Sequence, residues 1–262
     1  MKRGESFKVG VFDSGVGGLT VLYECVRLLP QVKFYYLGDN EHAPYGSRSE
    51  EEIIFLVEQA LQVFAKKGVD AVVLACNTVT AVAAERLRRE FPFPVVGIEP
   101  AIKPAAAQCK NILVLVTPRT AGSMRLSRLI SAVPQCAVTV FPAPDLAGAI
   151  EQAVTHNVPL NLSSHLPKGE YDGIVLGCTH YIYFKREIGA FYSAPVFDGN
   201  FGTAKRLASV LKQEIVGTAD HQKGEMTPNN NLQFSGNKRV KFLGNSAKIN
   251  EYVFKQTNVF KK

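Results

Sequence analysis

Eight short apolar runs, most of them followed by a stretch with helical spacing, recur along this chain of 262 residues. The runs are KVGVFD (8–13), KFYYLGD (33–39), DAVVLAC (70–76), PVVGI (94–98), NILVLVT (111–117), AVTVFPA (137–143), DGIVLGC (172–178) and PVFDG (195–199). Intervening segments such as 50–66 and 79–91 place apolar residues on one face of a helix. Continuous apolar strands that alternate with helices are typical of parallel sheets covered on both faces, so the sequence predicts an α/β fold.

One sequence element occurs twice. The segment GVDAVVLACNTVT (68–80) aligns without a gap with EYDGIVLGCTHYI (170–182), and the alignment pairs Cys76 with Cys178. The offset of 102 residues is the size of a domain half and is too long for a solenoid repeat. We therefore expect two similar α/β halves, each with a cysteine at the carboxyl end of a strand, where open α/β sheets bind ligands.

The cysteine count and the apolar runs exclude several classes of protein. The chain has five cysteines, an odd number, and none of them form a CxxC pair or a Cys/His metal-binding spacing. This argues against a disulfide framework and against a structural zinc site. No apolar run approaches the roughly 20 residues that span a bilayer. The N-terminus lacks the apolar core of a signal peptide. We expect a cytoplasmic protein with no metal and no membrane partner.

Most of the net charge of +7 lies in one segment. Residues 223–262 hold eight Lys or Arg against two acids, so this segment carries +6 and the other residues carry +1. A basic tail on a neutral body is typical of a solvated terminal element rather than of a nucleic-acid groove. We expect no nucleic-acid partner.

The matched cysteines suggest a chemistry that uses both. A cysteine just before a helix N-terminus lies near the positive end of the helix dipole, which is expected to lower the pKa of the thiol. Asn77, Thr78 and Thr179 are suited to cap the helices that follow. Either cysteine alone could be a buried structural residue. The duplication of strand, thiol and cap favours a functional pair.

Three kinds of reaction use cysteine side chains without a metal. A redox pair usually has its cysteines close in sequence, and a nucleophile–base hydrolase needs only one cysteine. Two acid/base groups of similar pKa on opposite sides of one carbon suit proton removal from one face and proton return to the other. The pair therefore favours racemisation or epimerisation.

The remaining polar motifs fit a small carboxylate ligand. Asp13, Ser14 and a glycine-rich turn stand between a predicted strand and a predicted helix. We expect the backbone N–H groups of Gly15, Gly17 and Gly18 to be open to an anion. A dinucleotide-binding motif is only weakly matched, because Thr20 stands where Gly or Ala is needed. LGDNEHAPYGSRS (37–49) is either a surface loop or part of the site. His180 is either structural or a partner of the thiol two residues before it.

Taken together, the motifs resemble a known family. DSGVGG (13–18), GDNEHAPYG (38–46), ACNT (75–78), VVGIEPA (95–101), TPRTAGS (117–123) and GCTHY (177–181) occur in the order and spacing of the glutamate racemase family, within the cofactor-independent aspartate/glutamate racemase superfamily. The resemblance is dense over residues 8–123, returns at 170–206 and is weak elsewhere. It implies racemisation of L- and D-glutamate without a cofactor, supply of D-glutamate for peptidoglycan, cell wall biogenesis and cell shape, and a homodimer.

The resemblance also implies roles by position. Cys76 and Cys178 would be acid/base residues on opposite faces of the substrate Cα, with Asp13 supporting the first thiol and His180 the second. The substrate would be held by Ser14, Tyr45, Gly46, Asn77, Thr78, Thr120 and Thr179, and Glu151 would be a further acidic partner near His180. The implied fold has two pseudo-symmetric domains, residues 1–98 plus 207–262 and residues 99–206, with the active site in the cleft between them.

The chain departs from the usual family pattern in several places. After GCTHY the family usually continues with Pro and aliphatic residues, whereas this chain has Ile182, Tyr183 and Phe184. Asn-Glu-His stands at 40–42, where the family more often has small and basic residues. FSGN (234–237) replaces a more usual SGD. Two alternatives stay open: a related racemase acting on aspartate or another amino acid, and a catalytically silent ligand-binding or interaction protein.

Overall fold

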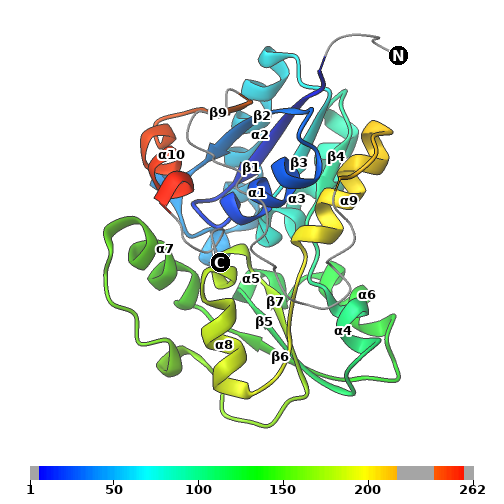
Figure 1. The fold of residues 1–262 in the computed structure, drawn as a ribbon, viewed down its shortest axis with the longest axis vertical. Coiled ribbons are helices and arrows are strands. Elements are labelled where there is room, and N and C mark those ends of the chain that lie inside the picture. The colour runs from blue at the N-terminus through cyan, green and yellow to red at the C-terminus, as the bar shows by residue number, and fades with distance from the viewer. Residues whose placement is uncertain (1–5, 217–238, 257–262) are drawn as a thin grey trace.

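The computed structural model describes residues 6–216 and 239–256. The strands of this part of the chain form two sheets, in the order β4-β3-β1-β2-β9 and β6-β5-β7-β8, and all the strand pairs are parallel. Figure 1 shows the two sheets in separate lobes, each flanked by helices and stacked along the long axis of the molecule. The predicted α/β class with parallel sheets is confirmed.

The first sheet forms the upper lobe in Figure 1. Its strands are β1 (Lys8–Asp13), β2 (Lys33–Gly38), β3 (Ala71–Leu74), β4 (Val95–Gly97) and β9 (Val240–Phe242). The helices around it are α1 (Leu19–Leu28), α2 (Glu50–Lys67), α3 (Asn77–Glu90), α9 (Asn200–Leu211) and α10 (Ala247–Gln256), with the 3-10 helices η1 (Asn40–His42) and η2 (Tyr45–Ser47).

The second sheet forms the lower lobe. Its strands are β5 (Asn111–Val116), β6 (Ala137–Pro142), β7 (Gly173–Gly177) and β8 (Val196–Asp198). Its helices are α4 (Ile102–Ala106), α5 (Pro118–Ala121), α6 (Met124–Ser131), α7 (Leu146–His156) and α8 (Lys185–Tyr192), with the 3-10 helices η3 (Leu162–His165) and η4 (Thr179–Phe184).

The local sequence explains the bounds of α2. Ser49 accepts a hydrogen bond from Glu52 N while the Glu52 side chain accepts one from Ser49 N, which closes a capping box at the start of the helix. Gly68 ends the helix in the left-handed conformation, with φ at 63°. Between these ends, residues such as Ile53, Val57 and Leu61 are buried at helical spacing, and they pack the helix against the first sheet.

The two lobes share a core. The largest cluster of buried apolar side chains includes Val11 and Val73 from the first sheet and Leu115 and Leu176 from the second. Burial of apolar surface is the main favourable contribution to packing, so the lobes are joined by more than their connecting segments.

The described elements bear on the expected domain boundary. A crossing near residue 98 falls between β4 and α4. A return at residues 206 and 207 falls inside α9, and this helix packs against α1, β3 and β4. The packing of the whole helix on the first lobe favours a return at the junction of β8 and α9, a few residues earlier than the sequence predicts.

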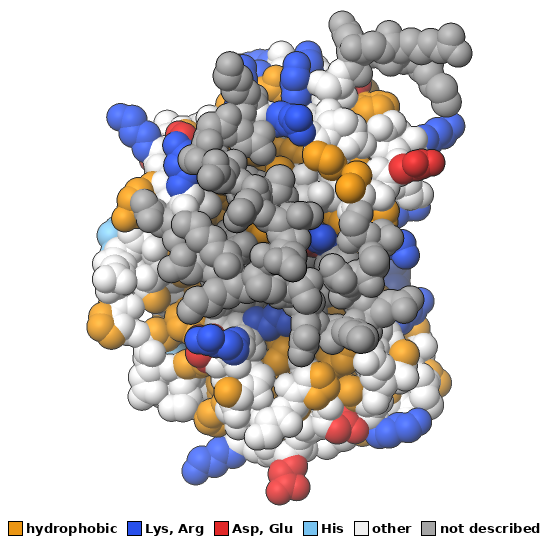
Figure 2. Space-filling view, in the orientation of Figure 1, with side chains coloured by type: hydrophobic (Ala, Val, Ile, Leu, Met, Phe, Trp, Pro, Cys, Tyr) orange, Lys and Arg blue, Asp and Glu red, His pale blue; other side chains and the backbone are white. Residues whose placement is uncertain are grey.

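The basic segment 223–262 contributes two described elements. β9 extends the first sheet beside β2, and α10 follows it. The motif FSGN (234–237) lies outside the described residues. On the face seen in Figure 2, Lys and Arg side chains are scattered over both lobes rather than gathered in one patch. None of the described helices combines the length and the apolar character that crossing a membrane requires.

Candidate active site

The two matched cysteines follow equivalent strands of the two sheets. Cys76 lies two residues after β3 and immediately before α3, while Cys178 follows β7 directly and precedes η4. Both are buried, with 6% and 7% of their surface exposed. β3 and β7 are interior strands of their sheets. The predicted placement of each thiol at the carboxyl end of a strand is therefore confirmed.

A chain of buried polar side chains extends from Cys178. Its Sγ lies 3.8 Å from His180 Nδ1, and His180 Nε2 lies 2.6 Å from Glu151 Oε2. Burial opposes a charge on the imidazole, but hydrogen bonds with Cys178 and Glu151 outweigh it and hold the pKa of His180 well above its usual value. Burial likewise opposes ionisation of Glu151, yet His180 keeps the pKa of this carboxyl below its usual value. An imidazolium therefore lies beside Cys178, and a carboxylate contacts the far nitrogen of that imidazolium.

The glycine-rich loop, residues 14–18, binds carboxylates of the chain itself. Gly15 N donates to Asp13 Oδ1 at 2.8 Å, and Val16 N donates to Glu151 Oε2 at 3.0 Å. Thr179 Oγ1, from the second lobe, donates to Asp13 Oδ2 at 3.1 Å. The expectation that the N–H of Gly15 is open to a ligand is wrong, because the buried Asp13 carboxylate already accepts from it. The N–H of Val16 is likewise taken by Glu151.

Gly17 allows this loop to approach the second lobe closely. A Cβ atom at this position would lie 2.6 Å from His180 Nδ1 and 2.6 Å from Thr179 Oγ1. Both distances are shorter than real Cβ contacts, so any other residue would force the loop away from η4.

Cys76 has different neighbours from Cys178. Its Sγ lies 3.5 Å from Ser14 Oγ. Burial, followed by the charge of Asp13, raises the pKa of Cys76 to about 11, although Ser14 and the N–H of Val79 act in the opposite direction. The position before α3 predicts a lowered pKa, and this prediction is wrong for Cys76 because the loss of water outweighs the helix N-terminus. Cys76 is therefore a thiol at neutral pH.

Asp13→Asn is expected to stabilise the fold at neutral pH. Asp13 is fully buried, and burial raises the pKa of its carboxyl despite the charge of His180 and the N–H of Gly15. A group with a higher pKa in the folded protein binds its proton more tightly there, so its contribution to stability falls as pH rises above about 4. The neutral amide avoids this loss. Calorimetry should find a Tm about 2–4 °C above that of the wild type at pH 8, and a difference that vanishes toward pH 4.

Asp172→Asn is the matched control for this measurement. Asp172 is exposed, and hydrogen bonds from the backbone N–H groups of Lys110 and Asn111 hold the pKa of its carboxyl below its usual value. Its replacement should therefore lower Tm at neutral pH, whereas Asp13→Asn should raise it. A Tm gain for Asp13→Asn that is the same at every pH would contradict the assignment of the gain to the buried charge.

Three threonine hydroxyls connect the lobes at their strand ends. Thr78 Oγ1 lies 3.0 Å from Thr117 Oγ1, which donates to Thr120 Oγ1 at 3.0 Å. All three residues are buried. Thr78 lies in the first turn of α3, whereas Thr117 follows β5 and Thr120 lies in α5. The structure thus brings two predicted binding residues together through Thr117, which the motifs alone do not single out.

The other predicted binding residues differ in what they offer a ligand. Asn77 is buried, and its Nδ2 has no hydrogen-bond partner among the described residues. Tyr45 is also buried, but its hydroxyl already donates to Asp39 Oδ2 at 2.6 Å. Gly46 packs so closely that a Cβ atom there would lie 2.8 Å from Thr117 Cβ. Asn77 is therefore the clearest open donor beside Cys76.

Two residues outside the predicted set join the lobes at the site. Asn40 Nδ2 donates to Glu151 Oε1 at 2.5 Å, and the Tyr183 hydroxyl donates to Val16 O at 2.8 Å. These partners are 111 and 167 residues apart in the chain. Asn40 and Tyr183 both fall where the sequence departs from the usual family pattern, and this departure is the only signal in the sequence that marks them.

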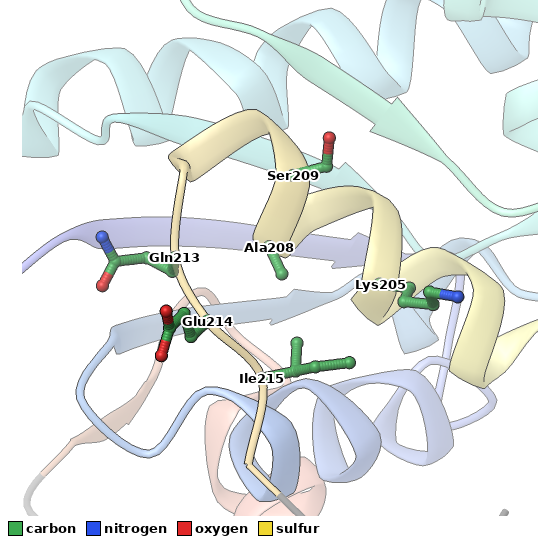
Figure 3. A pocket seen from close by; sticks show the side chains of 6 residues that line it. All are labelled: Lys205, Ala208, Ser209, Gln213, Glu214 and Ile215. Atoms are coloured by element: carbon green, nitrogen blue, oxygen red, sulfur yellow. The ribbon is translucent and has the colours of Figure 1, made fainter. Parts of the chain in front are cut away.

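A surface hollow lies apart from these residues (Figure 3). It is formed by α9 and the segment after it, and its lining consists of Lys205, Ala208, Ser209, Gln213, Glu214 and Ile215. None of the predicted site residues lines it, and its two charged groups have opposite sign. Over residues 6–216 and 239–256, no group of three or more His, Cys, Asp or Glu side chains is placed to hold a metal ion.

Residues 17–207 match the family model described as Asp/Glu/Hydantoin racemase. A glutamate racemase of Clostridium botulinum is 35% identical over 229 residues, which cover 84% of this chain and 89% of that protein. A glutamate racemase of Leptospira interrogans is 38% identical over 215 residues, covering 79% of this chain and 84% of the relative.

Solved structures are similar as well. The crystal structure of Escherichia coli glutamate racemase, in complex with L-glutamate and the activator UDP-MurNAc-ala, has a TM-score of 0.73 and 31% identity to this chain. The match covers 80% of this chain and 84% of the other. The similarity in fold thus extends over both lobes.

Proposed function

The chain belongs to the Asp/Glu/Hydantoin racemase family and is a racemase, and from this premise we propose that it interconverts L- and D-glutamate without a cofactor, through Cys76 and Cys178. One observation carries the proposal: two buried thiols stand at equivalent strand ends of two parallel sheets, each with its own polar partner. The relatives named glutamate racemase support glutamate as the substrate.

In the proposed reaction, one sulfur removes the α-proton and the opposite sulfur returns a proton to the other face of the carbon. The roles reverse for the other enantiomer, so no net proton is gained or lost. Cys76, with its pKa of about 11, carries a proton at neutral pH and is ready to donate it. The imidazolium of His180 lies beside Cys178 and can donate a hydrogen bond to its sulfur.

The difficult step is the formation of a carbanion next to a carboxylate. Donors aimed at the developing negative charge lower this barrier most when they are fixed in place and shielded from water. The unpaired Nδ2 of Asn77 and the buried Thr120 hydroxyl, which accepts from Thr117, are suited to this task. The hydroxyls of Thr78 and Thr179, which donate to Thr117 and Asp13 in this structure, would redirect their protons when they bind the substrate. Ser14, Tyr45 and Gly46 complete the proposed set that holds the substrate, in the cleft between the two domains.

The proposal extends to the cellular role. The protein acts in the cytoplasm as a homodimer and supplies D-glutamate for peptidoglycan, hence for cell wall biogenesis and cell shape. Two domains carry one thiol each: the predicted division is residues 1–98 plus 207–262 and residues 99–206, and the packing of α9 on α1, β3 and β4 supports a return at the start of that helix. Relatives named glutamate racemase support the formation of D-glutamate, and the peptidoglycan role is what the family resemblance implies.

Hydrogen exchange at Cα tests the proposed reaction and its substrate. In D₂O the protein should place deuterium at Cα of L-glutamate and of the D-glutamate that forms, as followed by NMR and polarimetry. L-Aspartate, shorter by one methylene, should react about 10–200-fold more slowly. A preference for aspartate would assign the chain to the related racemases, and no exchange with either acid would indicate a catalytically silent binding protein.

A further inference from the structure

The residue Val16 is held from both lobes. On one side, the Tyr36 hydroxyl of β2 donates to Gly15 O at 2.6 Å. Gly15 O and Val16 N belong to the same peptide group, so this bond fixes the N–H that donates to Glu151. On the other side, the Tyr183 hydroxyl of η4 donates to Val16 O at 2.8 Å. Both tyrosines are buried, so neither hydrogen bond is shared with bulk water.

Glu151 is held from two directions by the first lobe. Its Oε2 accepts from Val16 N at 3.0 Å, and its Oε1 accepts from Asn40 Nδ2 at 2.5 Å. The same Oε2 accepts from His180 at 2.6 Å. The carboxylate that orients the imidazole is therefore placed by donors from the opposite lobe, and Tyr183 fixes one of these donors.

The position of Tyr183 in the chain adds to this argument. Tyr183 and His180 belong to the same 3-10 helix, η4. The Tyr183 hydroxyl thus ties the element that carries the imidazole to the loop that aims Val16 N at Glu151. An aliphatic side chain at this position would have no hydroxyl and could not donate this bond.

We propose that Tyr183 and Asn40 are positioning residues that hold Glu151, and through it His180, in register with Cys178. The inference rests on the proposed function of Cys178, and it concerns how the Cys178 side of the site is assembled across the lobes. Neither residue needs to touch the substrate. Tyr183 acts through Val16, and Asn40 acts on Glu151 directly.

Tyr183→Phe tests the proposal because it removes one oxygen atom. It should lower kcat for glutamate about three- to tenfold, in line with the loss of one buried hydrogen bond, and should leave KM within about twofold. Asn40→Ala should act in the same direction, and it keeps the proposal testable if Tyr183→Phe does not fold. Tyr192→Phe is the matched control, since it removes a hydroxyl that donates to Pro167 O at 2.7 Å within the second lobe. It should leave kcat unchanged.

A double-mutant cycle separates positioning from general stability. If Tyr183 and Asn40 act through Glu151, each change should lower kcat by less than about twofold in a Glu151→Gln background. Equal fold-changes in both backgrounds would overturn the inference.

A second measurement does not depend on turnover. The ¹⁵N chemical shift of His180 Nε2 should move in Tyr183→Phe and in Asn40→Ala, and should stay in place in Tyr192→Phe. Unchanged shifts in both variants would overturn the positioning role. If the wild type failed to racemise glutamate, the proposed function would fall, and these chemical shifts would still decide whether the two residues position the imidazole.

Discussion

Cys76→Ser and Cys178→Ser are each expected to lower the rate of glutamate racemisation by at least about 10³-fold. A serine hydroxyl keeps the size and a hydrogen-bonding group, but it holds its proton far too tightly to act as a base near neutral pH. Because each enantiomer needs one base and one acid on opposite faces, the loss of either thiol blocks both directions. Polarimetry with L- and with D-glutamate would measure the loss.

Cys136→Ser provides the control for this experiment. Cys136 is also buried in the second lobe, and its sulfur contacts the backbone oxygens of Cys109 and Ala137, which a hydroxyl can also reach. This variant should keep its activity. Full activity in either Cys76→Ser or Cys178→Ser would rule out the two-thiol scheme.

Glu151→Gln is expected to lower kcat about 10²-fold at pH 8, with a smaller loss at pH 6. Glu151 is one of the two groups that hold the pKa of His180 above its usual value against the effect of burial. Without the carboxylate, the imidazolium loses its proton at a lower pH, so the deficit should grow as pH rises. The titratable groups Cys178 and Asp13 also face this imidazole and stay unchanged in the variant. Profiles of kcat between pH 5.5 and 9.5 would measure the effect.

Glu85→Gln is the matched change for Glu151→Gln. Glu85 lies on the surface, where it forms an exposed ion pair with Arg128, and such pairs contribute little. Its pH profile should overlay that of the wild type. A Glu151→Gln deficit of constant size across the pH range would mean that the carboxylate does not act through the charge of His180.

The sequence predicts where the two thiols lie in the fold, because the end of a strand is a local feature of the sequence. The duplicated segment around Cys76 and Cys178 locates both thiols at the carboxyl ends of interior strands, as observed. All eight predicted strands are present, with bounds that differ by at most two residues at either end. β9 is not predicted, because its three residues in a basic segment carry too little pattern to be recognised.

The contacts between the lobes could not be predicted in this way. Thr117, Asn40 and Tyr183 each acquire a role only when two distant segments meet, and nothing in their local sequence encodes the partner. The pKa of Cys76 could not be predicted from the local sequence either. A helix N-terminus can be read from the sequence, whereas burial and the charge of Asp13, which dominate here, depend on packing.

The unequal partners of the two thiols have a consequence for the kinetics. Cys76 faces the Ser14 hydroxyl, while Cys178 faces an imidazolium backed by a carboxylate. Mirror-image substrates have the same free energy in water, so kcat/KM must be the same for the L and D enantiomers of glutamate. A difference between the two thiols can therefore make kcat and KM differ between the two enantiomers. The ratio of the two kcat values must then equal the ratio of the two KM values. If the asymmetric site has a lower KM for one enantiomer, it must also have a lower kcat for that enantiomer.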